Sequence, residues 1–402
     1  MTRIVLAAGC AADPVTPREP QPHEVLQDKG FPALKKVFEA YVDGDVQTLI
    51  PGQDGETLFV VRSRTTDQGN NESNYTTDLV GVPINRNPSP STAEPDFPFS
   101  LSLSDDSKRF YSWGAVGPYI GVMYTGSNGL HGGVSFIDPK KGSNQVPLDC
   151  PILDADTSTP TAILAGAQIY YVLGKNDLTH STAGALGKFD SSKLTNCQFD
   201  VLKRLPLANP AALAFAGGYL LIGDAGNPWA PQSLGNGRLL YLDPANYQIK
   251  SDVRNIPDGF ALNGPAPVSG DGTVLFTGNS AEGNSLTLAG AQSDVKRVRI
   301  AKVTNQYVSG GTFVGSSRFV IYNAQNVMTD DTTQQRQKVT ESYVANTQTG
   351  EPVLLQRAAS FYAVPFVQVG AHTYCQGAVG AALDETGGDR TLVTCWEEIS
   401  DK

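Results

Sequence analysis

Basic clusters and long hydrophobic runs are both missing from this sequence. Its 30 lysines and arginines are outnumbered by 40 acidic residues, which leaves a formal net charge of −10. Without a basic patch, binding to nucleic acid or to an anionic membrane surface is not expected. No apolar stretch reaches the roughly 18 residues that a membrane-spanning helix needs, so none is predicted.

The local motifs of common enzyme and metal sites are also missing. The chain contains no GxSxG elbow, HExxH helix, Walker A loop or EF-hand loop. Its cysteines form no paired CxxC, so thiolate binding of zinc is not expected. The sequence therefore predicts no metal and no cofactor, and it favours a binding protein over an enzyme without deciding between them.

Glycine, proline and small polar residues are abundant instead. There are 41 glycines and 26 prolines but only 3 methionines, and charged residues make up 17% of the chain. This composition is typical of many short strands joined by turns, because long surface helices need more charged residues and fewer turn residues.

A repeated pattern organises most of the chain. Alternating apolar residues, a turn of Asp, Gly or Ser, and a second alternating run occur seven times, at spacings of 45 to 60 residues. Each repeat predicts a β-hairpin. The predicted turns are Asp54-Gly55, Asp106-Ser107, Gly166-Ala167, Gly217-Gly218, Asp271-Gly272, Ser316-Ser317 and Gly370-Ala371.

Further strands follow each hairpin. A polar loop leads to a third apolar strand, as in GGVSFIDPKKG and GRLLYLDPANYQ, and a more variable fourth strand usually comes next. Four short strands repeated seven times predict an all-β, seven-bladed β-propeller with four-stranded antiparallel blades. We assign residues 35–402 to this single domain.

The blade motifs carry a family resemblance. The DGxxL turns and LDP-type strand ends are similar to those of bacterial YVTN and quinoprotein-like propellers, over roughly residues 35 to 400. The Trp-docking signature of the pyrroloquinoline quinone enzymes is absent, so no quinone is expected.

The two ends of this domain complement each other. The last unit, from Ser360 to Trp396, stops after its third strand, whereas KKVFEAYVDGD near residue 35 is strand-like and has no hairpin of its own. We therefore predict that the N-terminal strand completes the last blade and closes the ring, which would remove an exposed sheet edge.

The first residues indicate export. MTRIVLAAGC resembles the end of a bacterial lipoprotein signal, shortened at its start, with Gly9 before a lipidated Cys10. The Pro-rich residues 11–34 would then be a tether, and the protein a periplasmic or surface lipoprotein of the outer membrane. Two alternatives stay open: an ordinary N-terminus, and eukaryotic secretion, since Asn71 and Asn74 fit glycosylation acceptors.

Four further cysteines fit an oxidising compartment. In the propeller frame Cys375 and Cys395 lie on neighbouring strands of the last blade, and Cys150 and Cys197 lie in similar places of adjacent blades. We predict the disulfides Cys150–Cys197 and Cys375–Cys395. The alternative is four buried free thiols in a cytosolic protein.

The resemblance implies that loops between second and third strands share one rim with the blade-to-blade connections. Aromatic residues assigned to this rim would suit a sugar, a planar ligand or a protein partner. They are Trp113, Tyr119, Tyr124 and Trp229. The alternative for the two tryptophans is packing of loops on the blade ends.

Two histidines, His131 and His180, fall in rim loops of adjacent blades. They are included among the binding residues, because imidazole titrates near neutral pH and binds transition metals. A metal site would need a third ligand, for which Asp177 and Asp224 are candidates. The alternative is two solvated loop histidines.

These observations predict an exported, membrane-anchored propeller that acts as a binding or scaffolding module. Its partner would be a protein of the cell envelope, or a small-molecule or glycan ligand, bound on one rim. The competing hypothesis is a propeller hydrolase or lyase for sugars or lactones, with single residues of several blades in the central channel.

Overall fold

The strands of this protein are short and nearly all antiparallel. The computed structural model describes residues 30–67, 73–84, 94–103, 108–126, 132–151, 159–164, 169–174, 184–189, 199–205, 207, 210–224, 237–256, 264–280, 283–290, 295–299, 307–329, 336–383 and 389–399. In these ranges no helix is long and apolar enough to cross a membrane.

The described residues form strands and one short 3₁₀ helix. They are β1 (Leu34–Asp43), β2 (Asp45–Pro51), β3 (Thr57–Asp67), β4 (Ser73–Pro83), β5 (Phe99–Ser102), β6 (Lys108–Val116), β7 (Tyr119–Gly126), β8 (Gly132–Ile137), η1 (Pro139–Lys141), β9 (Leu148–Pro151), β10 (Thr159–Leu164), β11 (Ile169–Gly174), β12 (Gly184–Phe189), β13 (Phe199–Leu205), β14 (Pro210–Ala216), β15 (Tyr219–Asp224), β16 (Gly237–Leu242), β17 (Ile249–Ile256), β18 (Gly264–Pro265), β19 (Val274–Ser280), β20 (Gly283–Ala289), β21 (Val295–Arg299), β22 (Tyr307–Val314), β23 (Ser316–Thr329), β24 (Arg336–Asn346), β25 (Pro352–Ala359), β26 (Tyr362–Val369), β27 (Thr373–Leu383) and β28 (Asp389–Glu398).

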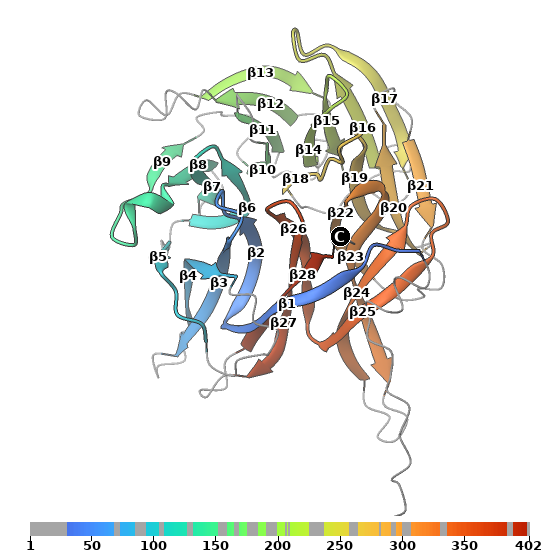
Figure 1. The fold of residues 1–402 in the computed structure, drawn as a ribbon. Coiled ribbons are helices and arrows are strands. Elements are labelled where there is room, and N and C mark those ends of the chain that lie inside the picture. Colours follow the sequence, from blue (N-terminus) through green and yellow to red (C-terminus); the bar gives the residue numbers. More distant parts are fainter. Residues whose placement is uncertain are drawn as a thin grey trace, which may run out of the picture.

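These strands form small sheets arranged around one axis, which is the architecture of a β-propeller (Figure 1). Six sheets contain four or more strands: β2–β5, β6–β9, β10–β13, β14–β18, β22–β25, and β26–β28 with β1. We call the last of these the closing sheet. The predicted propeller of four-stranded antiparallel blades is therefore present, but the described residues form six such blades and not seven, one of them with β18 added in parallel.

The difference arises in the unit around Asp271-Gly272, whose described residues form the three-stranded sheet β19–β21. Its expected first strand contains Pro265 and Pro267, which have no N–H to donate to a ladder. The segment is reduced to β18, which pairs in parallel with β14, and to an isolated bridge between Val268 and Val274.

A second correction concerns the turn predicted at Asp106-Ser107. β5 pairs with β4, whereas β6 pairs with β7, so the two flanking strands belong to different sheets. The hairpin turn of this blade is Gly117-Pro118, between Val116 and Tyr119. Gly117 has a φ of 55°, which a residue without a side chain adopts at little cost. The predicted turns at Asp54-Gly55 and Gly217-Gly218 are confirmed.

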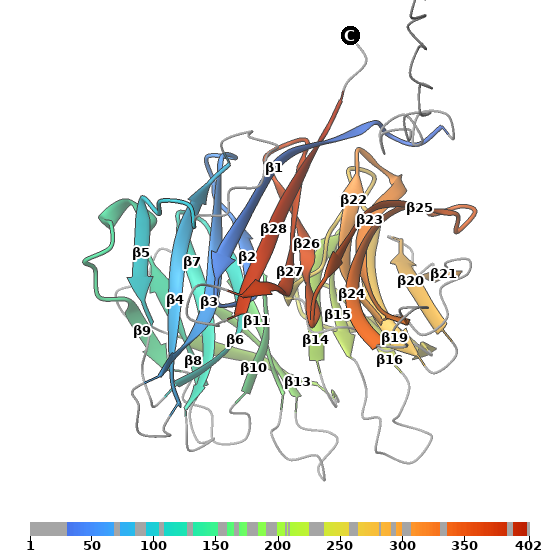
Figure 2. The ribbon, with the colours of Figure 1, turned by 90° about the horizontal axis from the view of Figure 1, so that it is seen from below.

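β1 lies against the C-terminal strand β28 over its whole length (Figures 1 and 2). The antiparallel register runs from Leu34 opposite Glu398 to Asp43 opposite Arg390. Residues assigned from the sequence to the tether also belong to the folded body, because Phe31 and Leu34 are buried.

The closing sheet is buried on both faces, which explains its nearly continuous apolar strands. On one face Val393 and Cys395 join a core cluster with Val60 and Val80 of the β2–β5 sheet. On the other, Trp396 packs with Ile321 and other residues of the β22–β25 sheet. Packing between neighbouring sheets thus supplies the core.

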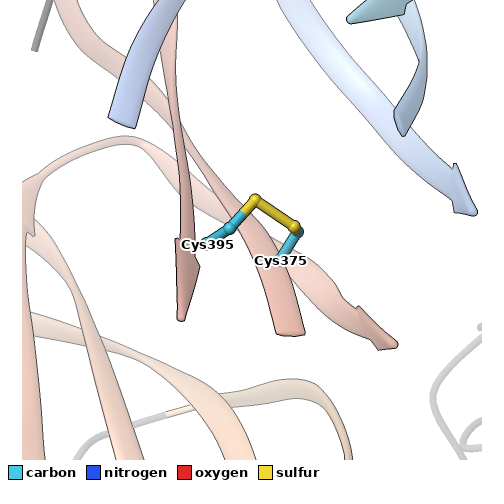
Figure 3. Close-up of a disulfide and its surroundings, with 2 residues drawn as sticks. All are labelled: Cys375 and Cys395. Atoms are coloured by element: carbon cyan, nitrogen blue, oxygen red, sulfur yellow. A yellow bond between two sulfur atoms is a disulfide. The ribbon is translucent and has the colours of Figure 1, made fainter. Parts of the chain in front are cut away.

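A disulfide joins β27 to β28 within this sheet. Cys375 and Cys395 are directly opposite in the ladder and fully buried, and their sulfur atoms are 2.06 Å apart (Figure 3). This predicted pair is confirmed. Cys150 is also disulfide-bonded, whereas its predicted partner Cys197 lies outside the described residues.

Candidate functional site

The propeller has two rims. The hairpin rim carries the turns between first and second strands, such as Gly117-Pro118 and Gly217-Gly218. The strand-end rim, at the other end of the strands, carries the connections between second and third strands and those between sheets. On this rim β1 ends at Asp43 and β2 begins at Asp45, where the closing sheet meets the β2–β5 sheet.

Alternating charges cross this junction. Arg390 of β28 donates from Nε to Asp43 Oδ1 at 2.6 Å, and its guanidinium lies over the ring of Tyr41. The Asp43 backbone oxygen accepts a 3.0 Å hydrogen bond from Arg62 Nη1, which also donates to Glu94. These contacts connect β28, β1 and β3 through paired groups.

The buried end of this network is Arg62, whose side chain is 4% exposed. Its Nε lies 3.8 Å from Asp78 Oδ2, and Arg64 donates to the same carboxylate oxygen from Nε at 3.0 Å. The Arg62 guanidinium also stacks over the ring of Phe97. Each charged residue of this network has an oppositely charged partner, although Arg62 Nε is buried without a hydrogen bond among the described residues, and the network positions the rim.

Two carboxylates beside the network have no cationic partner within the described part of the chain. Burial, and then the charge of Asp389, raise the pKa of Asp45. Burial and the charges of Asp45 and Asp389 also raise the pKa of the Tyr362 phenol. The three groups, on β2, β26 and β28, therefore influence one another electrostatically, and Gly44 N, beside Asp45, donates to Asp389 O at 2.7 Å. Phe361, the residue before Tyr362, is 54% exposed.

This group has a defined position in the ring. β2 and β26 are the first strands of their sheets and lie nearest the axis, so Asp45 and Tyr362 mark the axis side of the strand-end rim (Figure 1). Carboxylates accept hydrogen bonds from hydroxyl or ammonium groups, and aromatic faces cover apolar or cationic surface. No cluster of three metal-ligating side chains is found among the described residues.

The structure separates several residues predicted to share one rim. Tyr119 is the first residue of β7, beside the hairpin turn, whereas Tyr124 is near the other end of the same strand. Tyr124 is buried, at 6% exposure, rather than presented in a loop. Trp113 lies within β6, not in a connection.

The remaining predicted site residues fall mostly outside the described ranges. This applies to His131, His180, Asp177 and Trp229, and to the predicted lipidation residue Cys10. Asp224, offered as a third metal ligand, ends β15 and is 3% exposed.

The candidate residues Asp45, Asp389, Tyr362 and Phe361 were not selected from the sequence. Asp45 lies in the VDGDV segment that was recognised only as a strand, and Asp389 lies in the GGDR loop. A signal was present for Asp389, which immediately precedes the predicted strand RTLVTCWEEIS, whereas Asp45 ends the strand-like stretch KKVFEAYVDGD. Nothing in the sequence indicated that the two strands begin side by side.

Comparisons with known proteins agree with the fold. No protein-family model and no curated protein matches the chain. The chain is similar to the solved propeller of Dos1, with 12% identity, a TM-score of 0.51, and coverage of 90% of this chain and 95% of that one. It is also similar to an oligogalacturonate lyase in complex with manganese, with 9% identity, a TM-score of 0.51, and coverage of 90% and 93%.

A third similar structure is a mutant of puromycin hydrolase in complex with PGG, with 10% identity and a TM-score of 0.51. This alignment covers 87% of the chain but only 53% of the hydrolase. At such low identities the similarities establish the propeller fold alone, and they do not decide between a binding module and an enzyme.

Proposed function

We propose that this protein is an exported propeller that acts as a binding or scaffolding module in the cell envelope, and that it captures a protein or glycan on its strand-end rim. The observation that carries the binding site is the electrostatic coupling of Asp45, Asp389 and Tyr362 on the rim where Phe361 is also exposed. Unpaired carboxylates and an exposed aromatic side chain on one rim suit a partner with hydroxyl or cationic groups on an apolar body.

Two features support export. The disulfide between β27 and β28 is typical of an oxidising compartment, and so is the bonded state of Cys150. The N-terminal resemblance to a lipoprotein signal adds a membrane anchor at Cys10. Membrane fractionation of the Cys10→Ala variant tests the anchor, because unchanged membrane association would contradict it.

The rim is tested by isolating the protein from its native envelope and identifying what co-purifies. We expect Phe361→Ser to lose the partner or ligand while keeping its melting temperature. Phe215→Ser is the matched control, because Phe215 is 49% exposed and lies beside the Gly217-Gly218 turn on the other rim. Equal retention by both variants would contradict the proposed face.

The enzyme hypothesis has one specific observation in its favour. The raised pKa of Asp45, whose charge also raises the pKa of Tyr362, is compatible with a proton-transferring carboxyl group near the axis. The purified protein should then cleave sugar or lactone substrates in a panel assay, and Asp45→Asn should abolish that activity. Absence of turnover by a preparation that still binds its partner would favour the binding module.

We further propose that the pairing of β1 with β28 closes the ring, as the sequence predicted. The contacts that support it extend beyond the ladder, since Thr391 Oγ1 on β28 accepts from Val46 N and donates to Gly44 O. A chain lacking residues 30–43 should fail to fold alone and recover when a peptide of those residues is added. A stable truncated chain would contradict closure by this strand.

A further inference from the structure

The seam between the β22–β25 sheet and the closing sheet changes character along its length. Near the hairpin rim it is apolar, with Phe366, Trp396 and Ile321 in one core cluster. Toward the strand-end rim the same faces carry amide, hydroxyl and carboxyl groups on buried residues, apart from Gln356, which is half-buried. We call this second part the polar seam; its residues are Asn323, Ser342, Gln356, Gln376, Thr394 and Glu39.

One side of the polar seam is well hydrogen-bonded. Asn323, fully buried on β23, donates from Nδ2 to Val364 O at 2.7 Å and to Gln376 Oε1 at 3.3 Å. Ser342 on β24 donates to Asn323 Oδ1 at 3.0 Å. These bonds join the two sheets directly.

The other side is formed by the row Gln376, Thr394 and Glu39, which are cross-strand neighbours on β27, β28 and β1. Glu39 is 8% exposed and accepts from Lys36 Nζ at 2.7 Å. Gln356 of β25 donates from Nε2 to the same Glu39 oxygen at 3.4 Å. The Gln356 amide therefore lies close to the Thr394 row.

Two groups of the polar seam, one on Thr394 and one on Gln356, have no hydrogen-bond partner among the described residues. Thr394 is 0% exposed, and its Oγ1 has no hydrogen-bond partner among the described residues. Gln356 Oε1 is likewise buried without a partner there, although its own Nε2 contacts Glu39. A third such atom is Gln325 Nε2. Gln325 lies on β23 two residues beyond Asn323, so its side chain projects from the same face of the sheet as Asn323.

Unsatisfied groups of this kind are unfavourable, because each forfeits its hydrogen bonds to water without replacement. Several within one small region indicate a shared polar occupant. The unsatisfied groups are a hydroxyl, an amide oxygen and an amide N–H. An occupant that bonds to all of them must be small and neutral, and it must both donate and accept hydrogen bonds. We propose that the polar seam is a binding site for ordered water, which bridges Thr394 Oγ1 and Gln356 Oε1.

Replacement of Thr394 tests this site through the sign of the stability change. Valine has the shape of threonine but cannot hydrogen-bond, so with water bound Thr394→Val loses a bond and its Tm falls by about 1–3 °C. Thr394→Ser keeps the hydroxyl and should bind the same water. Thr391→Val is the matched reference, because Thr391 is also 0% exposed on β28 but bonds to protein atoms. A Thr394→Val protein as stable as the wild type, or more stable, would overturn the proposal.

A double-mutant cycle tests the bridge itself. If one water joins the two groups, Thr394→Val and Gln356→Leu remove the same interaction, so their combined Tm shift is smaller than the sum of the single shifts. Additive shifts would overturn the shared bridge. A crystal structure gives the direct measurement: density within hydrogen-bond distance of both atoms is expected, and a seam that closes by direct contact of these side chains would refute the site.

Discussion

The ring of Phe31 lies 5.4 Å from the ring of Phe319, although Phe31 precedes β1 and Phe319 lies near the start of β23 in another sheet. The N-terminal segment therefore makes a packing contact in addition to the β-ladder that it forms with β28. The segment thus pairs with one sheet and packs against the next, as does Glu39 through Gln356.

Phe31→Ala should therefore destabilise the protein, although Phe31 lies outside any strand. The ring is buried at 7% exposure, and removing a buried Phe side chain typically costs about 3 kcal/mol of unfolding free energy. Chemical denaturation monitored by fluorescence measures the loss. Phe361→Ala is the matched control, because an exposed ring should change the free energy by less than about 0.5 kcal/mol. Equal effects of both changes would contradict the packing role.

Removal of the disulfide should weaken the closing sheet. Cys375 and Cys395 are 20 residues apart, and a loop of this size corresponds to about 3 kcal/mol of stabilisation in the chain-entropy description. The Cys375→Ala/Cys395→Ala protein should unfold at lower guanidinium concentration than the wild type. Without reductant, an unchanged midpoint would show that the bond does not form in solution.

Replacing the two aspartates that flank Gly44 by asparagine should change the stability of the protein in opposite directions. Asp43→Asn weakens the ion pair with Arg390, so the free energy of unfolding should fall. The expected decrease is about 1 kcal/mol, which is typical of a partly exposed pair. Burial and the charge of Asp389 raise the pKa of Asp45, so its charged form is unfavourable in the folded protein at neutral pH. The free energy of unfolding of the Asp45→Asn variant, measured by chemical denaturation, should therefore rise. The comparison is internally controlled, because both changes are isosteric. A decrease for both variants would contradict the assignment of Asp45 as an unpaired charge.

The hairpin turn at Asp271 should contribute to the acid sensitivity of the protein. Hydrogen bonds from Ser269, Ser317 and Thr273 lower the pKa of Asp271 from 3.8 to about 2. A carboxyl group with a lowered pKa contributes stability above its unfolded value and loses it as the pH falls through the folded value. The wild-type Tm should therefore drop more than that of Asp271→Asn between about pH 4 and pH 2.

The Ser317 contact offers a graded control for this titration. Ser317 lies near the start of β23 and donates to Asp271 Oδ2 on the neighbouring hairpin, so Ser317→Ala removes one of the stabilising bonds. Its acid-induced Tm loss should lie between those of the wild type and Asp271→Asn. Three superimposable pH profiles would show that Asp271 does not contribute.

Local sequence patterns predicted much of the fold. Alternating apolar residues on both sides of Asp54-Gly55 and Gly217-Gly218 identified real hairpins, because turn chemistry and side-chain alternation are properties of a few adjacent residues. The same logic was wrong at Asp106-Ser107. There two alternating runs flank a polar turn but enter different sheets, and only strand pairing distinguishes a hairpin from a connection.

The candidate site was beyond local patterns for a related reason. Asp45 and Asp389 come from opposite ends of the chain, and they are neighbours because β1 and β28 share a ladder and β2 follows β1 after one residue. The environment that raises the pKa of Asp45 exists only once both strands are in place.

The sequence by itself therefore determined the repeated hairpins, the propeller class and the disulfide between Cys375 and Cys395, since each depends on the spacing of residues along the chain. Only the tertiary structure decided the number of four-stranded blades and the polar groups that meet at the strand-end rim and in the polar seam. Those depend on which sheet a strand joins and which face it turns to its neighbour. Both are set by contacts between residues far apart in the chain, and so no short stretch of it can encode them alone.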